Sequence, residues 1–148
     1  MTKPKVLISD KMDPNAAAIF RERGCEVDEI TGLTPEELIK IIGQYDGLAI
    51  RSSTKVTKEI LEHCTNLKVI GRAGIGVDNV DIPAASAKGV VVMNTPFGNS
   101  ITTAEHAIAL MFALARQIPD ANAKTQAGLW PKNGFMGVEV TGKTLGLI

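Results

Sequence analysis

The chain has 148 residues, of which 45% are hydrophobic and 22% are charged, a balance typical of soluble globular proteins and unlike that of disordered or collagen-like chains. Its 16 basic and 16 acidic residues cancel, which argues against the broad basic surface that binds nucleic acids or anionic membranes. The apolar run at residues 6–8 is too short for a signal peptide or a membrane span. We therefore expect a cytoplasmic protein without nucleic-acid or membrane partners, in which any anion site is local.

Strand and helix signals alternate through the first 98 residues. Short apolar runs predict strands, and each run is followed by a segment with the caps or the apolar spacing of a helix. The predicted strands span residues 6–8, 26–30, 47–50, 68–70 and 90–93. The predicted helices span about residues 14–23, 34–43, 57–63 and 81–89. Asp13 and Asp81 precede prolines as N-caps, and Thr34 with Glu37 predicts a capping box.

This alternation predicts the fold class. Apolar strands that alternate with helices are typical of a parallel sheet with helices on both faces. We therefore expect an α/β domain with a flavodoxin-like, doubly wound parallel sheet. Ligands of such sheets bind outside the carboxyl ends of the strands, where the loops with Arg51, Arg72 and residues 94–99 fall.

The pattern changes after residue 98. Residues 101–116 are apolar nearly all round and predict a helix buried between layers, with residues 102–105 as a capping box at its entrance. A short helix follows over about residues 119–127, and the chain ends in what predicts the start of a buried strand. The Pro- and Gly-containing segment at residues 94–99 suggests a hinge, so we divide the chain into residues 1–98 and 99–148.

Side chains that often carry chemistry form no obvious group. Cys25 and Cys64 lie in no metal-binding pattern, which favours free thiols over a disulfide or zinc site. His63 and His106 have no partner at the spacing of a catalytic relay, and we assign no catalytic or metal-binding residue. Trp130 is expected to pack in its loop, with a subunit contact as the alternative.

A glycine-rich segment, GRAGIG at residues 71–76, follows the predicted fourth strand. Gly74 and Gly76 allow backbone amides to approach an anion closely and to form a small nest. The segment is not a GxGxxG motif, because Asn79 stands where the third glycine would be. Taken alone, it is equally compatible with a structural turn.

Two arginines fall at neighbouring strand ends. Arg51 and Arg72 together would favour an anion between them, since each guanidinium can make charge-assisted bonds to phosphate or carboxylate. The alternative is that each pairs separately with a carboxylate such as Asp46 or Asp78.

Together these segments make the chain resemble the D-2-hydroxyacid dehydrogenase family over almost its whole length. The segments RSSTKVT and FMG favour the phosphoglycerate branch of that family. The resemblance rests on seven motifs in order: KVLISD, LAIRSSTKVT, VIGRAGIGVDNVD, GVVVMNTPFGNS, AEHAIALMFALARQIP, FMGVEV and GKTLG.

The resemblance implies an NAD-dependent oxidation of 3-phospho-D-glycerate to 3-phosphohydroxypyruvate, the entry step of serine synthesis. Residues 1–98 would form the substrate-binding (lid) domain and residues 99–148 the first helices of a Rossmann nucleotide domain. By the same resemblance, Arg51, Arg72 and Asn99 would meet the substrate phosphate, and Ser52 beside Arg51 would also contact the substrate.

The glycine segment and one lysine complete the implied site. The amides of Gly74, Ile75 and Gly76 would meet the substrate carboxylate, and Ile75 would also lie on the nicotinamide side. Lys132 matches a basic position that approaches the site of a neighbouring subunit, where relatives often carry arginine. The full-length protein would then be a homodimer or homotetramer.

Several parts that the resemblance implies lie outside these 148 residues. They are the GxGxxG turn, the acidic residue for the ribose, and the Arg, Glu and His that bind and deprotonate the substrate. We therefore expect this chain alone, whether truncated, proteolysed or the product of a split gene, to bind substrate without turnover.

Three alternatives remain open. In the first, the enzyme is a dehydrogenase or reductase for a non-phosphorylated substrate, either glycerate or glyoxylate, or lactate. A non-catalytic flavodoxin-like module, such as a phosphoacceptor receiver, would need an acid after the third strand, whereas Asp46 precedes that strand. The chain could also act as a non-catalytic partner or scaffold.

Overall fold

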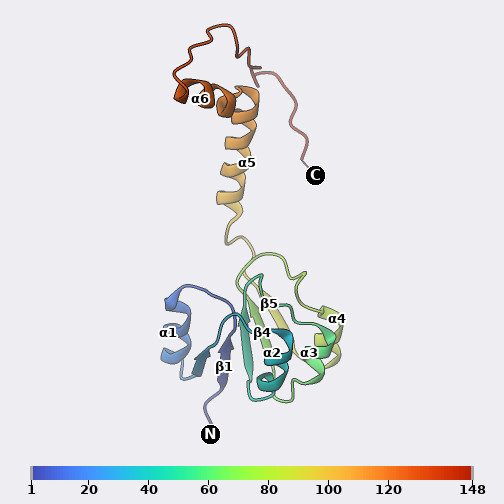
Figure 1. The fold of residues 1–148 in the computed structure, drawn as a ribbon. Helices are drawn as coiled ribbons and strands as arrows, with labels where there is room; N and C mark the ends of the chain where they lie inside the picture. The colour runs from blue at the N-terminus through green and yellow to red at the C-terminus, as the bar shows by residue number, and fades with distance from the viewer. Residues whose placement is uncertain (1, 148) are drawn as a thin grey trace. The chain divides into compact units, whose positions relative to one another are not determined.

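The computed structural model describes residues 2–147. The chain divides into two compact units, Met1–Gly98 and Asn99–Ile148, and each is described by itself. The first unit contains a five-stranded sheet in the order β2-β1-β3-β4-β5, with every neighbouring pair parallel (Figure 1). The strands are β1 (Lys5–Ile8), β2 (Glu26–Glu29), β3 (Gly47–Ile50), β4 (Val69–Arg72) and β5 (Val91–Asn94). This order is that of a flavodoxin-like, doubly wound sheet, so the predicted fold class is confirmed.

Local capping signals start the helices of the first unit. These helices are α1 (Pro14–Glu22), α2 (Pro35–Ile42), α3 (Lys58–Glu62) and α4 (Ile82–Ala87). Asp13 and Asp81 each accept a hydrogen bond from a backbone amide of the first turn, at 2.8 and 2.9 Å. Thr34 and Glu37 exchange bonds in the predicted capping box. Such caps each stabilise a helix by about 1 kcal/mol.

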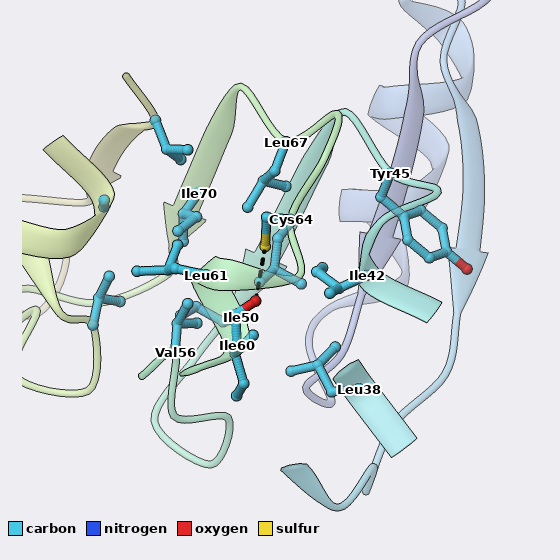
Figure 2. Packing of buried hydrophobic residues seen from close by; sticks show 14 of the residues in the cluster. Leu38, Ile42, Tyr45, Ile50, Val56, Ile60, Leu61, Cys64, Leu67 and Ile70 are labelled. Carbon is cyan, nitrogen blue, oxygen red and sulfur yellow. Dashed lines mark hydrogen bonds between the residues drawn. The ribbon is translucent and has the colours of Figure 1, made fainter. Parts of the chain in front are cut away.

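Side chains of the central strands alternate between two cores. Leu7, Leu48 and Ile50 join the larger cluster with α2, α3 and α4, whereas Ile8 and Ala49 join a smaller cluster with Ala17 of α1. This alternation follows from the two-residue period of a strand. Figure 2 shows the larger cluster, in which the buried Cys64 thiol donates to the carbonyl of Ile60 at 3.3 Å. The two faces of the sheet are thus covered unequally.

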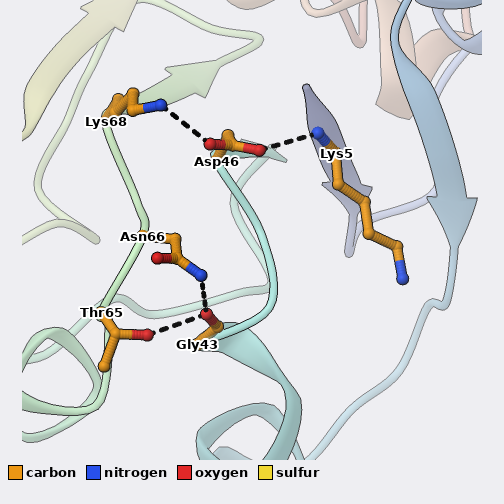
Figure 3. Close-up of polar contacts among 6 residues, drawn as sticks. All are labelled: Lys5, Gly43, Asp46, Thr65, Asn66 and Lys68. Carbon is orange, nitrogen blue, oxygen red and sulfur yellow. Dashed lines mark hydrogen bonds and ion pairs between the residues drawn. The ribbon is translucent and has the colours of Figure 1, made fainter. Parts of the chain in front are cut away.

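Asp46 ties together the amino ends of neighbouring strands. Its carboxylate accepts the backbone amide of Lys5 at 2.9 Å and the Nζ of Lys68 at 3.0 Å, as Figure 3 shows. Beside it, the carbonyl of Gly43 accepts bonds from Thr65 and Asn66. These contacts connect the residues that precede β3 and β4 with α2 and β1.

A buried tyrosine lies next to this edge. The hydroxyl of Tyr45 donates to Asp28 Oδ2 at 2.8 Å, and Lys5 Nζ lies 2.9 Å from the same oxygen and 4.9 Å from the centre of the tyrosine ring. Burial, with the adjacent Asp28 carboxylate, raises the pKa of Tyr45 to about 12. The neutral phenol is therefore part of the folded state.

The second unit contains α5 (Ser100–Ala115) and α6 (Ile118–Gln126). The expectation of a buried helix is wrong for α5: none of its residues is buried, and Ile101 and Leu114 are 76% and 82% exposed. Among the described residues of this unit, α6 and irregular segments are all that could cover a helix that is apolar nearly all round. The predicted capping box at residues 102–105 is also wrong, because the helix begins earlier, after Asn99, without a side-chain cap bond.

The segment after α6 is irregular. The buried strand expected at the chain's end is wrong for the described residues, since residues 143–147 form no strand and Leu145 and Leu147 are 65% and 89% exposed. A strand needs a neighbouring backbone with which to pair, and the second unit offers none there; Ile148 lies outside the described residues. Among the helices of residues 2–147, none has the length and apolarity needed to cross a bilayer.

Because Tyr45 is the chain's single tyrosine, its ionisation can be measured directly. We expect the phenolate absorbance of the folded chain to rise with a midpoint near 12. Since the pKa is raised in the folded state, this contribution to stability is complete below the ordinary tyrosine pKa of about 10 and is lost as pH rises through 12.

Asp28→Asn is the matched variant. It removes the carboxylate but keeps the burial, so its midpoint should fall between the ordinary value and that of the parent chain. A parent midpoint near 10, with circular dichroism still that of the folded chain, would contradict the buried, hydrogen-bonded phenol.

Candidate functional site

Four polar residues gather where the parallel strands end. Arg51 directly follows Ile50, which pairs with Arg72 at the end of β4, and Arg72 in turn pairs with Asn94 at the end of β5. Asp10 follows β1, whose last residues pair with β3. Because the strands are parallel, all of these residues lie at the carboxyl edge of the sheet, where ligands of doubly wound folds bind.

The carboxylate of Asp10 organises the loop after β3. It accepts the backbone amides of Arg51 at 2.6 Å, Ser53 at 3.2 Å and Thr54 at 3.1 Å. It also accepts the hydroxyl of Thr54 at 2.7 Å, and that hydroxyl lies 2.9 Å from Ser9 Oγ. Asp10 is only 5% exposed, so the loop is built around a buried acid that the sequence did not single out.

Hydrogen bonding decides the charge state of Asp10. Burial alone raises the pKa of its carboxyl, but the bonds from Thr54, Arg51 and Ser53 outweigh burial and hold the pKa below its ordinary value. The carboxylate form therefore stabilises the fold above the ordinary carboxyl range, and this contribution is lost as pH falls through the lowered pKa.

Asn79 holds the same loop from the other side. Its Nδ2 donates to the carbonyls of Arg51 at 2.8 Å and Thr54 at 2.7 Å, and the backbone carbonyl of Asn79 accepts the amide of Val56 at 2.8 Å. From the sequence, Asn79 was noted only as the residue that stands where a GxGxxG motif would have its third glycine. In the structure its side chain makes two hydrogen bonds to the loop, which a glycine could not make.

Both arginines lack a carboxylate partner. The guanidinium of Arg51 is exposed, and among residues 2–147 its acceptor is the carbonyl of Lys11, at 3.3 Å. Within residues 2–147 the ion pairs are Lys5 with Asp28, Arg21 with Glu29 and Lys68 with Asp46. Neither arginine therefore forms an ion pair with Asp46 or Asp78, the alternative that the sequence left open.

Arg72 lies over the glycine segment. Its Nε is buried and has no hydrogen-bond partner among the described residues. The guanidinium occupies the space in which a side chain at position 74 would lie, so this contact, and not a positive φ, favours glycine at position 74. Two cationic groups thus lie at adjacent strand ends with donors left over, the arrangement that an anion satisfies.

The glycine segment offers fewer free amides than expected. The amide of Gly74 donates to the carbonyl of Arg72 at 2.9 Å, so the sharp turn after β4 uses it internally. The carbonyl of Ile75 accepts Asn94 Nδ2 at 2.7 Å, while the amides of Ile75 and Gly76 have no acceptor within the described residues. The side chain of Ile75 is 44% exposed beside them. The nest therefore consists of two amides instead of three.

The remaining predicted residues belong to the second unit. Asn99 precedes α5 and is exposed, without a capping bond. Lys132, also exposed, lines a hollow of about 320 Å³ between α6 and the following loop, together with Trp130 and Phe135. The expectation that Trp130 packs in its loop is wrong within this unit, since the side chain is 76% exposed.

Comparison with known proteins identifies the family. The chain matches the catalytic domain of D-isomer specific 2-hydroxyacid dehydrogenases over residues 6–143. It is 49% identical over 144 residues to the D-3-phosphoglycerate dehydrogenase of Archaeoglobus fulgidus, a match that covers 97% of this chain and 27% of that protein. The chain belongs to the D-isomer specific 2-hydroxyacid dehydrogenase family.

Two crystal structures share the fold. A protein of Pyrococcus horikoshii OT3 is similar with a TM-score of 0.78 and 31% identity, over 93% of this chain and 43% of that one. The NAD+-bound 3-phosphoglycerate dehydrogenase of Entamoeba histolytica has a TM-score of 0.69 and 33% identity, over 77% of this chain and 40% of that one. The chain spans about a quarter of the length of the curated relatives it matches.

Gly74→Ala tests the contact between Arg72 and the glycine segment. The added methyl would overlap the guanidinium of Arg72 and push this flexible side chain away. We expect a clear shift of the Arg72 Nε–H signal in nuclear magnetic resonance spectra. The free energy of unfolding should change by only about 0.5 kcal/mol, as for other substitutions outside the core.

Gly71→Ala is the control, because a Cβ at position 71 meets nothing within 4 Å. It should leave the Arg72 signal in place. Equal shifts in the two variants would show that the guanidinium does not lie over Gly74.

Proposed function

We propose that this chain provides the substrate-anion part of the active site of an NAD-dependent D-2-hydroxyacid dehydrogenase that oxidises 3-phospho-D-glycerate to 3-phosphohydroxypyruvate. The observation that carries the proposal is the pair of guanidiniums at adjacent strand ends, neither of which has a carboxylate partner within residues 2–147. Family membership and the names of the relatives support the reaction class and the substrate.

The phosphate would bind at the end of β3 and β4. Arg51 and Arg72 would each donate charge-assisted bonds worth about 1.5–3 kcal/mol, and Ser52 would add a donor from the exposed loop between them. Asn99 of the second unit would complete this contact.

The carboxylate would bind at the glycine segment. The amides of Ile75 and Gly76 are the available donors, and Gly74 keeps the space for Arg72. The exposed side chain of Ile75 would lie against the nicotinamide. We further propose that Lys132 approaches the site of a neighbouring subunit in a homodimer or homotetramer.

The cofactor of the complete dehydrogenase would be NAD, a proposal supported by the NAD+-bound relative of Entamoeba histolytica. When bound, NAD supplies the acceptor for the hydride that leaves the hydroxyl-bearing carbon. The residues of this chain do not by themselves fit a dinucleotide, because they contain no GxGxxG turn for the pyrophosphate. Their part is to bind and orient the substrate.

The two units would then have different roles. We propose that the unit Met1–Gly98 is the substrate-binding (lid) domain and that the unit Asn99–Ile148 is the start of the NAD-binding domain. We place the protein in the cytoplasm, at the first step of serine synthesis. A non-phosphorylated D-2-hydroxyacid such as glycerate or lactate is the alternative substrate, but two cationic groups suit a phosphate better than a hydroxymethyl or methyl group.

Binding to the chain tests the anion site. Isothermal titration should show that 3-phosphoglycerate binds the parent chain more tightly than D-glycerate does, because only the former carries a phosphate for the arginines. Arg51→Gln should weaken binding of 3-phosphoglycerate by about tenfold or more, the loss of one charge-assisted contact. Arg21→Gln is the matched control, since Arg21 of α1 pairs with Glu29 of β2, a strand that β1 separates from β3 and β4.

Two results would contradict the assignment. Equal binding of 3-phosphoglycerate and D-glycerate would favour the non-phosphorylated substrate. An equal loss in the Arg21 and Arg51 variants would show that net charge, and not the position of Arg51, governs binding.

Turnover gives a separate test. The 148-residue chain should not oxidise NADH in the presence of 3-phosphohydroxypyruvate, measured as absorbance at saturating concentrations of both. The reason is that it contains no dinucleotide turn and no catalytic acid–base pair that we can assign. Robust oxidation of NADH by the purified chain would overturn the proposed division of labour.

A further inference from the structure

The loop over residues 51–54 is held in place by hydrogen bonds to the side chains of Asp10 and Asn79. Asp10 collects three backbone amides and one hydroxyl of this loop on a single carboxylate. The amide of Ser52 is the exception: it has no acceptor within the described residues, and Ser52 itself is exposed. The inward-facing donors are thus satisfied by protein, while the donors of Ser52 remain available to solvent or ligand.

The carboxylate of Asp10 does not form an ion pair with the guanidinium of Arg51. Asp10 bonds the backbone of Arg51 and not its guanidinium, although an acid next to an arginine would ordinarily form an ion pair. The backbone and hydroxyl donors already occupy both carboxylate oxygens of Asp10. An ion pair would compete with a bound anion for the guanidinium, so saturation of Asp10 by its loop keeps Arg51 able to bind one.

Asn79 connects this loop with the glycine segment. Through Nδ2 it donates to the carbonyls of Arg51 and Thr54, and in the sequence it lies three residues after Gly76. The pairing of β3 with β4 already places Arg72 beside Ile50, so a shift of Asn79 would move the loop over residues 51–54 relative to Arg72 and the glycine segment. Fixed spacing between donors is what makes an anion site pre-organised.

We propose that Asp10 and Asn79 are positioning residues of the anion site: they contact no substrate, but hold the loop over residues 51–54 so that Arg51 and Ser52 face the anion at a fixed distance from Arg72. The inference rests on the proposed function for the identity of the ligand. The holding of the loop itself is independent of any ligand.

The matched control is at the opposite edge of the sheet. Asp46, like Asp10, is a carboxylate that accepts a backbone amide from another segment, that of Lys5, but it contacts no residue of the loop. Asp10→Asn keeps the shape of the side chain and turns one acceptor oxygen into a donor facing other donors. Asp46→Asn makes the same chemical change at a site that does not contact the loop, so we expect it to affect only the stability of the fold.

The experiment measures loop order and binding in the same variants. Backbone relaxation of the 148-residue chain reports order at Arg51, Ser53 and Thr54, and titration with 3-phosphoglycerate and with inorganic phosphate reports affinity, each at a fixed interval below the melting temperature. Asp10→Asn should lower the order of the loop and weaken 3-phosphoglycerate binding at least tenfold. Asp46→Asn should leave loop order unchanged and affinity within about twofold.

If Asp10→Asn does not fold, two milder variants test the positioning role. Asn79→Ala removes both side-chain bonds to the loop, and Thr54→Val removes the hydroxyl bond to Asp10 while keeping the backbone contacts. Each should weaken binding with a smaller loss of stability than Asp10→Asn, and Asn79→Ala should change affinity more than Thr54→Val.

The outcomes separate the two proposals. Unchanged loop order in both Asp10→Asn and Asn79→Ala overturns the positioning role whatever the ligand, and equal loss of affinity in Asp10→Asn and Asp46→Asn does so as well. If the parent chain binds neither 3-phosphoglycerate nor phosphate, the proposed function fails. Loss of loop order in Asp10→Asn would then still support the holding of the loop.

Discussion

The contact on which the carboxyl edge of this sheet depends is the one between the buried carboxylate of Asp10 and the backbone of the loop after β3. A buried charge is costly unless hydrogen bonds compensate it, and here the compensation comes from amides that would otherwise be unpaired at a strand end. The hydrogen bonds therefore offset both the cost of burying the carboxylate and the cost of leaving the loop amides unpaired. The loop gains a fixed shape without regular secondary structure.

The two edges of the sheet treat charge differently. Near the amino ends of the strands, Lys5 pairs with Asp28 and Lys68 with Asp46, and these acids also accept bonds from Tyr45 and from the backbone. At the carboxyl edge, Asp10 is used by the loop and the arginines keep unpaired donors. The first arrangement pairs each lysine with an acid, whereas the second leaves both guanidiniums without a carboxylate partner among the described residues.

The sequence predicted those features that depend on near neighbours. Asp13, Thr34 and Asp81 cap helices through bonds that span two or three residues. Each of the five strands predicted from local sequence also overlaps a strand of the sheet. Asp10 could not be found in this way, because its partners are 41 to 44 residues away. A signal was present, since Asp10 lies two residues after the end of β1 in a fold whose ligands bind at strand ends. The prediction that α5 is buried was wrong for a related reason. Apolar composition indicates that a helix packs against other segments, but it does not indicate which segments these are.

The way in which Asp10 holds its loop also determines which substitutions the loop can accept. At position 53 the carboxylate uses only the backbone N–H, so the side chain of Ser53 is free to vary. Proline is the exception, because it has no N–H to donate. Position 54 is more restricted, since its hydroxyl is bonded as well. Variation among close relatives should therefore concentrate at position 53 and avoid proline there, while the residues at positions 10 and 79, whose side chains make the bonds, stay the same.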